Sequence, residues 1–267
     1  MNPDFVTMIA VLAFAASASH RLSILHRKKI KYFSLLQIFY IVIIPGILFT
    51  LLFTHLQSII SRPLLDDIIV SDKILTNSIL LSALFTYGGV VIHSVTKLYA
   101  TPRLLRYDKT KAGEMNKFFH LKFSHNLIYS GIVALFVSLV LLEMNHYPND
   151  NPSAISRATI KGILFGLSLF SALLFYTRPD KLFKDQKLYI GTWADLKLTF
   201  AAIWMGLLLI VYSIQDVNPA IRDYQLIIPS LVALAMVATI SVLLLIHHHR
   251  KKLPIHKRLL KKLSKLR

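Results

Sequence analysis

Residues 27–54 read RKKIKYFSLLQIFYIVIIPGILFTLLFT. Four basic residues lie within the first five positions, and none of the residues from 33 to 54 is charged. A helix of about 20 apolar residues crosses the hydrocarbon core of a bilayer, and Lys and Arg next to such a span stay on the cytoplasmic side. This stretch therefore predicts a transmembrane helix that begins on the cytoplasmic side.

Six further stretches are apolar over a similar length: 4–20, 75–96, 123–144, 159–177, 197–214 and 225–246. The basic residues lie mainly in alternate gaps between the seven stretches. The gaps 20–32, 97–122 and 178–197, together with the tail 250–267, hold 26 of the 31 Lys and Arg residues. This bias predicts seven transmembrane helices, with the N-terminus outside and the C-terminus in the cytoplasm.

We therefore expect an all-α fold, a polytopic integral membrane protein with about seven transmembrane helices and a basic amphipathic C-terminal tail. Residues 1–249 would form a single transmembrane domain and residues 250–267 a basic cytoplasmic tail. Ala16-Ser17-Ala18 resembles a signal-peptidase site, but residues 1–5 lack the basic residues that begin a signal peptide. Removal of this stretch would also place the basic tail outside, so we expect a retained helix.

The composition excludes several classes of protein. The 267-residue chain is 55% hydrophobic, which is too apolar for one soluble domain. It contains no cysteine, which excludes disulfides, thiolate catalysis and metal sites with cysteine ligands. The net charge of +18 lies almost wholly on one predicted face, so the expected partners are anionic lipid headgroups of the plasma (inner) membrane and not nucleic acid. A homo-oligomer or a membrane-protein partner is also compatible with this sequence.

The predicted tail is the best candidate for lipid binding. Ile255, Leu259, Leu260, Leu263 and Leu266 fall on one stripe of a helix, with basic residues on the other faces. The candidate lipid-binding residues are Arg250, Lys251, Lys252, Lys257, Arg258, Lys261 and Lys262.

Histidine is the one residue type whose distribution suggests a cofactor site. Nine of the eleven histidines lie on the predicted cytoplasmic side. His93 lies inside a predicted span, and antiparallel packing of the next span brings His125 to nearly the same depth, with His120 close before it. Imidazoles from neighbouring helices can ligate a haem iron or a divalent metal. The spacing argues against such a site, because positions 120 and 125 lie about 140° apart around an α-helix. Histidines are also common as plain interface residues.

Small residues and one proline predict how the helices pack. Pro45-Gly46 in the middle of a predicted span predicts a kink, because proline lacks the backbone donor. Gly162-x-x-x-Gly166 fits the pattern of small residues that lets two membrane helices approach closely. Ser78, Ser82, Gly89 and Gly131 predict similar contacts for the two spans that carry them.

No catalytic motif is found, and no enzymatic activity is assigned. The sequence has no nucleophile elbow and no paired Gly-rich phosphate loop, and few acidic residues lie deep in the predicted spans. The leading interpretation is a non-enzymatic permease-like or scaffold protein whose basic cytoplasmic face binds lipid or an acidic partner. The alternative is a haem- or metal-binding protein for electron transfer or lipid modification, with His93, His125 and His120 as cofactor-binding residues. A third interpretation is a lipid-modifying enzyme at the cytoplasmic interface.

Overall fold

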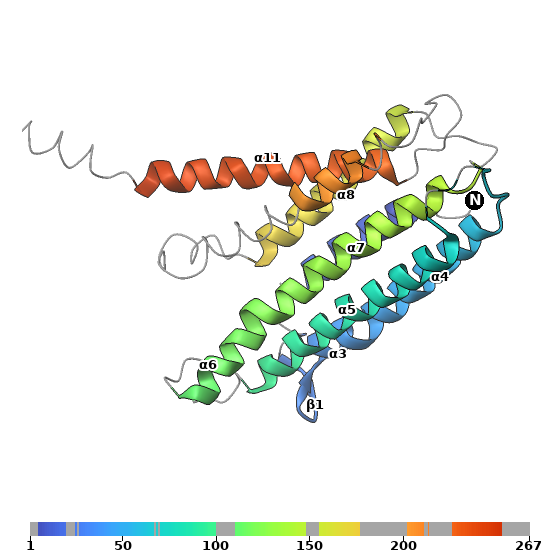
Figure 1. Cartoon of the computed structure of the whole chain (residues 1–267). Helices are drawn as coiled ribbons and strands as arrows, with labels where there is room; N and C mark the ends of the chain where they lie inside the picture. The colour runs from blue at the N-terminus through green and yellow to red at the C-terminus, as the bar shows by residue number, and fades with distance from the viewer. Residues whose placement is uncertain are drawn as a thin grey trace, which may run out of the picture.

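The computed structural model describes residues 5–19, 25, 27–66, 68, 70–99, 110–147, 155–176, 202–210, 213 and 226–252, which are mostly helical (Figure 1). The elements in chain order are α1 (Phe5–Ser19), β1 (Lys29–Ile30), β2 (Phe33–Ser34), α3 (Leu35–Ile38), η1 (Phe39–Ile43), α4 (Ile44–Ile60), α5 (Asp72–Tyr99), α6 (Lys111–Phe118), η2 (Phe119–Phe123), α7 (Ser124–Met144), α8 (Ile155–Tyr176) and α11 (Ile227–Lys252). The labels η1 and η2 denote π-helical segments.

Three helical stretches in the described part of the chain are long and apolar enough to cross a membrane: Leu35–Ile60, Asp72–Lys97 and Ser124–Met144. They coincide with three of the predicted spans, so the chain is a helical membrane protein as expected. Each of the other four predicted spans overlaps a helix, namely α1, α8, α11 or residues 202–210. The gap 97–122 between two of these spans is partly helical, because α6, η2 and α7 follow one another without a break from Lys111.

Helices α5 and α7 pack at backbone distance, as their small residues predict. A Cβ atom added to Gly131 of α7 would lie 2.8 Å from the carbonyl oxygen of Ser82 and would also clash with the side chain of Thr86. In the opposite direction, a Cβ atom on Gly89 of α5 would lie 2.8 Å from the carbonyl oxygen of Ser124. The two helices thus meet through reciprocal glycine contacts, which leave no room for a larger side chain.

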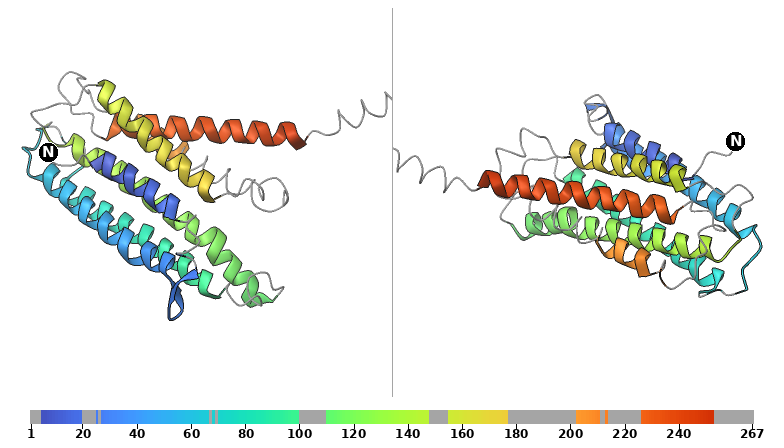
Figure 2. Two further views of the ribbon diagram at one scale, coloured as in Figure 1. Left: turned by 180° about the vertical axis from the view of Figure 1, so that it is seen from behind. Right: turned by 90° about the horizontal axis from the view of Figure 1, so that it is seen from above.

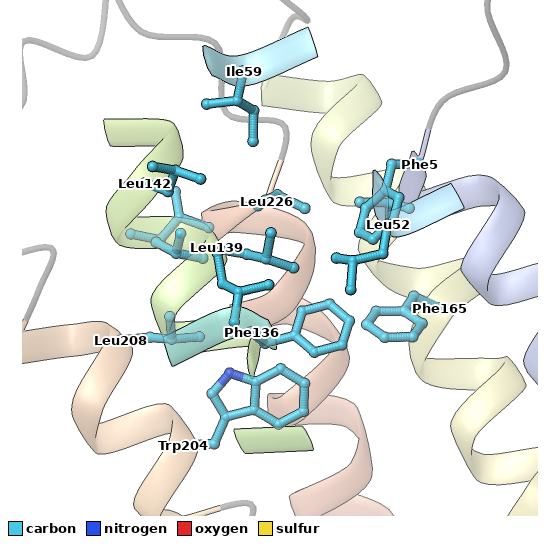
Figure 3. Close-up of a cluster of buried hydrophobic side chains, with 14 of the residues drawn as sticks. Phe5, Leu52, Ile59, Phe136, Leu139, Leu142, Phe165, Trp204, Leu208 and Leu226 are labelled. Atoms are coloured by element: carbon cyan, nitrogen blue, oxygen red, sulfur yellow. The ribbon is translucent and has the colours of Figure 1, made fainter. Parts of the chain in front are cut away.

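A second pair, α8 and α11, uses the Gly162-x-x-x-Gly166 pattern, and that prediction is confirmed. A Cβ atom on Gly162 would lie 2.8 Å from the carbonyl oxygen of Pro229, and one on Gly166 would lie 3.2 Å from the Cα atom of Ala233. Phe136 of α7 joins this pair to the rest of the core, with its ring centroid 5.8 Å from that of Phe165 in α8 (Figure 3).

Close to Pro45-Gly46, where the sequence predicts a kink, the helix contains the π-helical segment η1, which ends at Ile43. In a regular α-helix the backbone N–H at position 45 would bond to the carbonyl of Ile41. Proline has no such donor. The Tyr87 hydroxyl of α5 donates to the Ile41 carbonyl instead, at 3.2 Å. A side chain of the neighbouring helix therefore donates to the carbonyl that the proline leaves without its α-helical donor.

The helices have two distinct ends. The β1–β2 hairpin and α6 lie at one end, whereas the N-terminal end of α1 and the C-terminal ends of α4 and α7 lie at the other (Figures 1 and 2). We call the first the hairpin end and the second the loop end, after residues 61–71, which connect α4 to α5.

The loop end is held together by a polar cluster, the Asp72 clasp, formed by Asp72, Asn145, His146 and the Arg62 carbonyl. The Asp72 carboxylate accepts from Asn145 Nδ2 and contacts His146 Nε2, both at 2.8 Å. His146 Nδ1 donates to the Arg62 carbonyl at 2.9 Å. The clasp therefore ties the loop and the start of α5 to the end of α7.

Candidate functional site

Three histidines predicted as cofactor-binding residues converge between two helices near the hairpin end. The ring of His93 in α5 stacks on that of His120 in η2, with centroids 4.3 Å apart and an interplanar angle of 21°. His93 also lies against His125 of α7, at 4.8 Å and 46°. The third pair, His120 and His125, has its centroids 6.4 Å apart. The structure therefore brings all three predicted residues together.

The π-helical segment η2 explains how His120 and His125 reach the same neighbour. The backbone N–H of Ser124 bonds to the carbonyl of Phe119, five residues earlier. A π-helical turn contains an extra residue relative to an α-helical turn. The expectation that positions 120 and 125 share a face poorly is therefore wrong, because it assumed a regular α-helix. Segments of this kind are frequent at functional sites.

Hydrogen bonds fix the orientation of two of the rings. The His120 carbonyl accepts from Ser124 Oγ at 2.7 Å and from His93 Nδ1 at 3.4 Å. Thr96 Oγ1 donates toward the Ile92 carbonyl at 2.7 Å and lies 2.9 Å from His120 Nδ1. Because a hydroxyl has one proton, His120 Nδ1 is the donor to Thr96. In the neutral rings of His93 and His120, the proton is therefore on Nδ1 and Nε2 carries the lone pair.

This arrangement limits the chemistry of the cluster as it stands. Imidazole lone pairs lie in the plane of the ring, so two stacked rings do not direct them at one ion. Within the described residues, no group of three His, Asp or Glu side chains is placed to hold a metal ion. A porphyrin also does not fit between rings whose centroids are 4.3 Å apart. A bound metal or haem would require the rings to turn from this packing.

The hairpin end that surrounds the cluster is strongly basic. Eight basic residues lie on the described parts of this end, against the single acidic residue Glu114. They are Arg27, Lys28, Lys29, Lys31, Lys97, Lys111, Lys117 and Lys122. The loop end carries both signs, with the acidic residues Asp66, Asp72 and Glu143 beside the basic residues Arg62, Lys73, Arg157 and Lys161. Charge is therefore segregated along the axis of the helices.

The predicted lipid-binding residues of the tail are described only in part. Arg250, Lys251 and Lys252 belong to α11, which ends at Lys252. The other four, Lys257, Arg258, Lys261 and Lys262, lie outside the described residues.

Two polar residues of the cluster, Thr96 and Ser124, were not among the residues predicted from the sequence. Thr96 follows His93 by three positions, which places the two side chains on one face of an α-helix. Ser124 directly precedes His125. The spacing to His93 could therefore have identified Thr96, whereas the bond of Ser124 to the His120 carbonyl depends on the π-helical segment.

Deleting Leu121 tests whether the π-helical segment positions His120. With one residue fewer, the helix can run as a regular α-helix, which turns position 120 by about 100° relative to α7. We expect the cysteine pair Thr96→Cys and His120→Cys to cross-link under mild oxidation in the full-length chain and not in the deletion variant. The pair Ser78→Cys and Ser138→Cys is the control, because these hydroxyl oxygens are 2.9 Å apart on α5 and α7 and η2 does not separate them. Equal cross-linking of the first cysteine pair in both chains would show that η2 does not set the orientation.

Comparisons of this chain with protein-family models, curated proteins and solved structures give no match.

Proposed function

We propose that the chain is a seven-span inner-membrane protein, with its N-terminus outside and its C-terminus in the cytoplasm. It acts without enzymatic chemistry, as a scaffold or permease-like protein whose basic cytoplasmic face binds anionic lipids. The observation that carries this proposal is the segregation of charge between the two ends of the helices. Basic residues next to membrane spans favour the cytoplasmic side, so the hairpin end faces the cytoplasm.

Anionic lipid is the partner that fits a basic face beside apolar helices. The cytoplasmic leaflet carries negative lipid headgroups, which attract each nearby Lys or Arg by about 1 kcal/mol. The eight basic residues on the described part of the hairpin end would all lie at the level of these headgroups. The proposal includes two kinds of protein, a scaffold and a permease-like protein. The packing of α5 and α7 favours the scaffold, because these helices meet so closely at two glycines that there is no room even for a methyl group.

The lipid that stays bound to the purified protein tests this proposal. We expect anionic phospholipid to co-purify in detergent, and the triple variant Lys111→Gln, Lys117→Gln and Lys122→Gln to lose at least about fivefold of it. The control neutralises two basic residues toward the loop end, Lys73→Gln and Arg157→Gln, and should retain the lipid. Equal retention by both variants would argue against a lipid-binding hairpin end.

A second candidate function, cofactor binding, is favoured by the convergence of His93, His120 and His125. Metal-ligating histidines commonly donate one ring N–H to a backbone carbonyl or another acceptor, which orients the opposite nitrogen toward the metal. His93 and His120 have this arrangement, although their rings must turn for their lone pairs to converge. Absorption spectra and elemental analysis of the purified protein test it, with His55→Ala, a histidine near the loop end, as the control for His93→Ala. A colourless, metal-free protein would remove this candidate.

A further inference from the structure

Among the described residues of the hairpin end, the β1–β2 hairpin presents the longest run of exposed basic and apolar residues. All six residues from Arg27 to Tyr32 are exposed. Tyr32 is 82% exposed and Ile30 is 58% exposed, which is unfavourable for large apolar side chains in water. Three lysines, Lys28, Lys29 and Lys31, lie beside them. The hairpin thus combines positive charge with apolar side chains at its tip.

The hairpin is an ordered structure attached to the start of a membrane span. Lys29 pairs with Ser34 and Ile30 pairs with Phe33, and the N–H of Leu35 bonds to the Lys28 carbonyl at 2.9 Å. Ser34 caps α3, because its hydroxyl accepts from the Gln37 N–H at 3.2 Å. Since α3 begins the apolar stretch Leu35–Ile60, the hairpin lies where that span leaves the membrane.

The tip contains a backbone conformation that lysine rarely adopts. Lys31 has φ 54°, in the left-handed region that favours glycine. This region costs a residue with a side chain about 1–2 kcal/mol. Glycine would form the same two-residue turn without that cost, but it would remove the charge from the tip. The presence of lysine at this position is explained if its positive charge binds a partner at the tip of the hairpin.

We propose that residues 27–34 form a binding element for anionic phospholipids. The lysines hold the phosphate of the headgroup, while Tyr32 and Ile30 enter the boundary between headgroups and acyl chains. Aromatic side chains favour this boundary because one part of the ring system is apolar and its hydroxyl is polar. The proposal rests on the proposed function, and it names the element and the lipid chemistry of the basic face.

Lipid-specific quenching of a fluorophore on the hairpin tests this inference. The chain has no cysteine, so Arg27→Cys accepts a single contact-range fluorophore and leaves the lysines and Tyr32 in place. The full-length protein is reconstituted in vesicles of equal parts phosphatidylglycerol and phosphatidylcholine, with a nitroxide quencher on one lipid or the other. We expect labelled phosphatidylglycerol to quench at least about fivefold more strongly than labelled phosphatidylcholine.

A charge variant provides the decisive comparison. Lys28→Gln, Lys29→Gln and Lys31→Gly together remove three charges, and glycine keeps the left-handed turn. We expect this variant to be quenched equally by the two lipids. A preference for phosphatidylglycerol that survives the variant would overturn the role of the lysines.

A second label separates this inference from the proposed function. Met115→Cys places the fluorophore on α6, where Met115 is 62% exposed at the same end of the molecule. If only the α6 label prefers phosphatidylglycerol, the basic face binds anionic lipid but the hairpin does not, which overturns this inference and leaves the proposed function in place. If neither label shows a preference, both the inference and the proposed function are wrong.

Discussion

Replacing Gly131 by alanine is expected to lower the free energy of unfolding by about 2 kcal/mol or more, because overpacking a close helix contact forces backbone shifts. The new methyl group would lie 2.8 Å from the carbonyl oxygen of Ser82 and 2.9 Å from the backbone nitrogen of Thr86. Backbone atoms of a packed helix cannot turn away as a flexible side chain can. The helices α5 and α7 must therefore separate. Equilibrium unfolding in mixed micelles with increasing denaturing detergent measures the change.

Two glycines provide controls for this prediction. Gly89→Ala should be destabilising to a similar degree, because it is the reciprocal contact on α5. A Cβ atom on Gly46 would meet nothing within 4 Å. Gly46→Ala should therefore leave stability unchanged or raise it by up to about 1 kcal/mol, since alanine favours helix. Equal effects of Gly131→Ala and Gly46→Ala would contradict the close contact between α5 and α7.

Replacing Asp72 by alanine is expected to lower the free energy of unfolding by about 3 kcal/mol, because a buried polar group that loses its hydrogen-bond partner is destabilising. The substitution removes the carboxylate from both Asn145 Nδ2 and His146 Nε2. His146 is only 5% exposed, so water cannot replace the lost acceptor freely. Unfolding measurements should show the loss of stability, and hydrogen exchange should show faster opening of residues 61–66.

The neighbouring carboxylate of Asp66 provides the control for the clasp. Asp66 is exposed, so Asp66→Ala should change the free energy of unfolding by less than about 0.5 kcal/mol. Asp72→Asn should have an intermediate effect, because its amide oxygen can still accept one of the two bonds. If Asp72→Ala behaves like Asp66→Ala, the clasp does not stabilise the loop end.

Much of the helical architecture could be predicted from the sequence, because it depends on local composition. The apolar run from 33 to 54 determines the length of one helix. The small residues Gly89 and Gly131 determine how closely two helices approach each other. The convergence of His93 and His125 also follows from their depths in adjacent antiparallel spans. These features need no knowledge of side-chain geometry.

The details of the site could not be predicted, because they depend on hydrogen-bond register. A π-helical turn around Leu121 differs from an α-helical turn by one residue, and no residue type in that segment requires it. The clasp between Asp72 and His146 joins positions 74 residues apart, and it forms only when α5 and α7 pack in one register. The left-handed backbone conformation of Lys31 could not be predicted either, because glycine is the residue that usually adopts it.

The most direct test of the central claim is the side of the membrane on which each end of the helices lies. Because the chain has no cysteine, single cysteines can be placed at exposed positions and labelled with a membrane-impermeant maleimide in intact cells. We expect labelling of Ser61→Cys and Tyr147→Cys at the loop end. We expect labelling of Tyr32→Cys and Met115→Cys at the hairpin end only after the membrane is permeabilised. Labelling of the hairpin end in intact cells, or equal labelling of both ends, would show that the hairpin end does not face the cytoplasm.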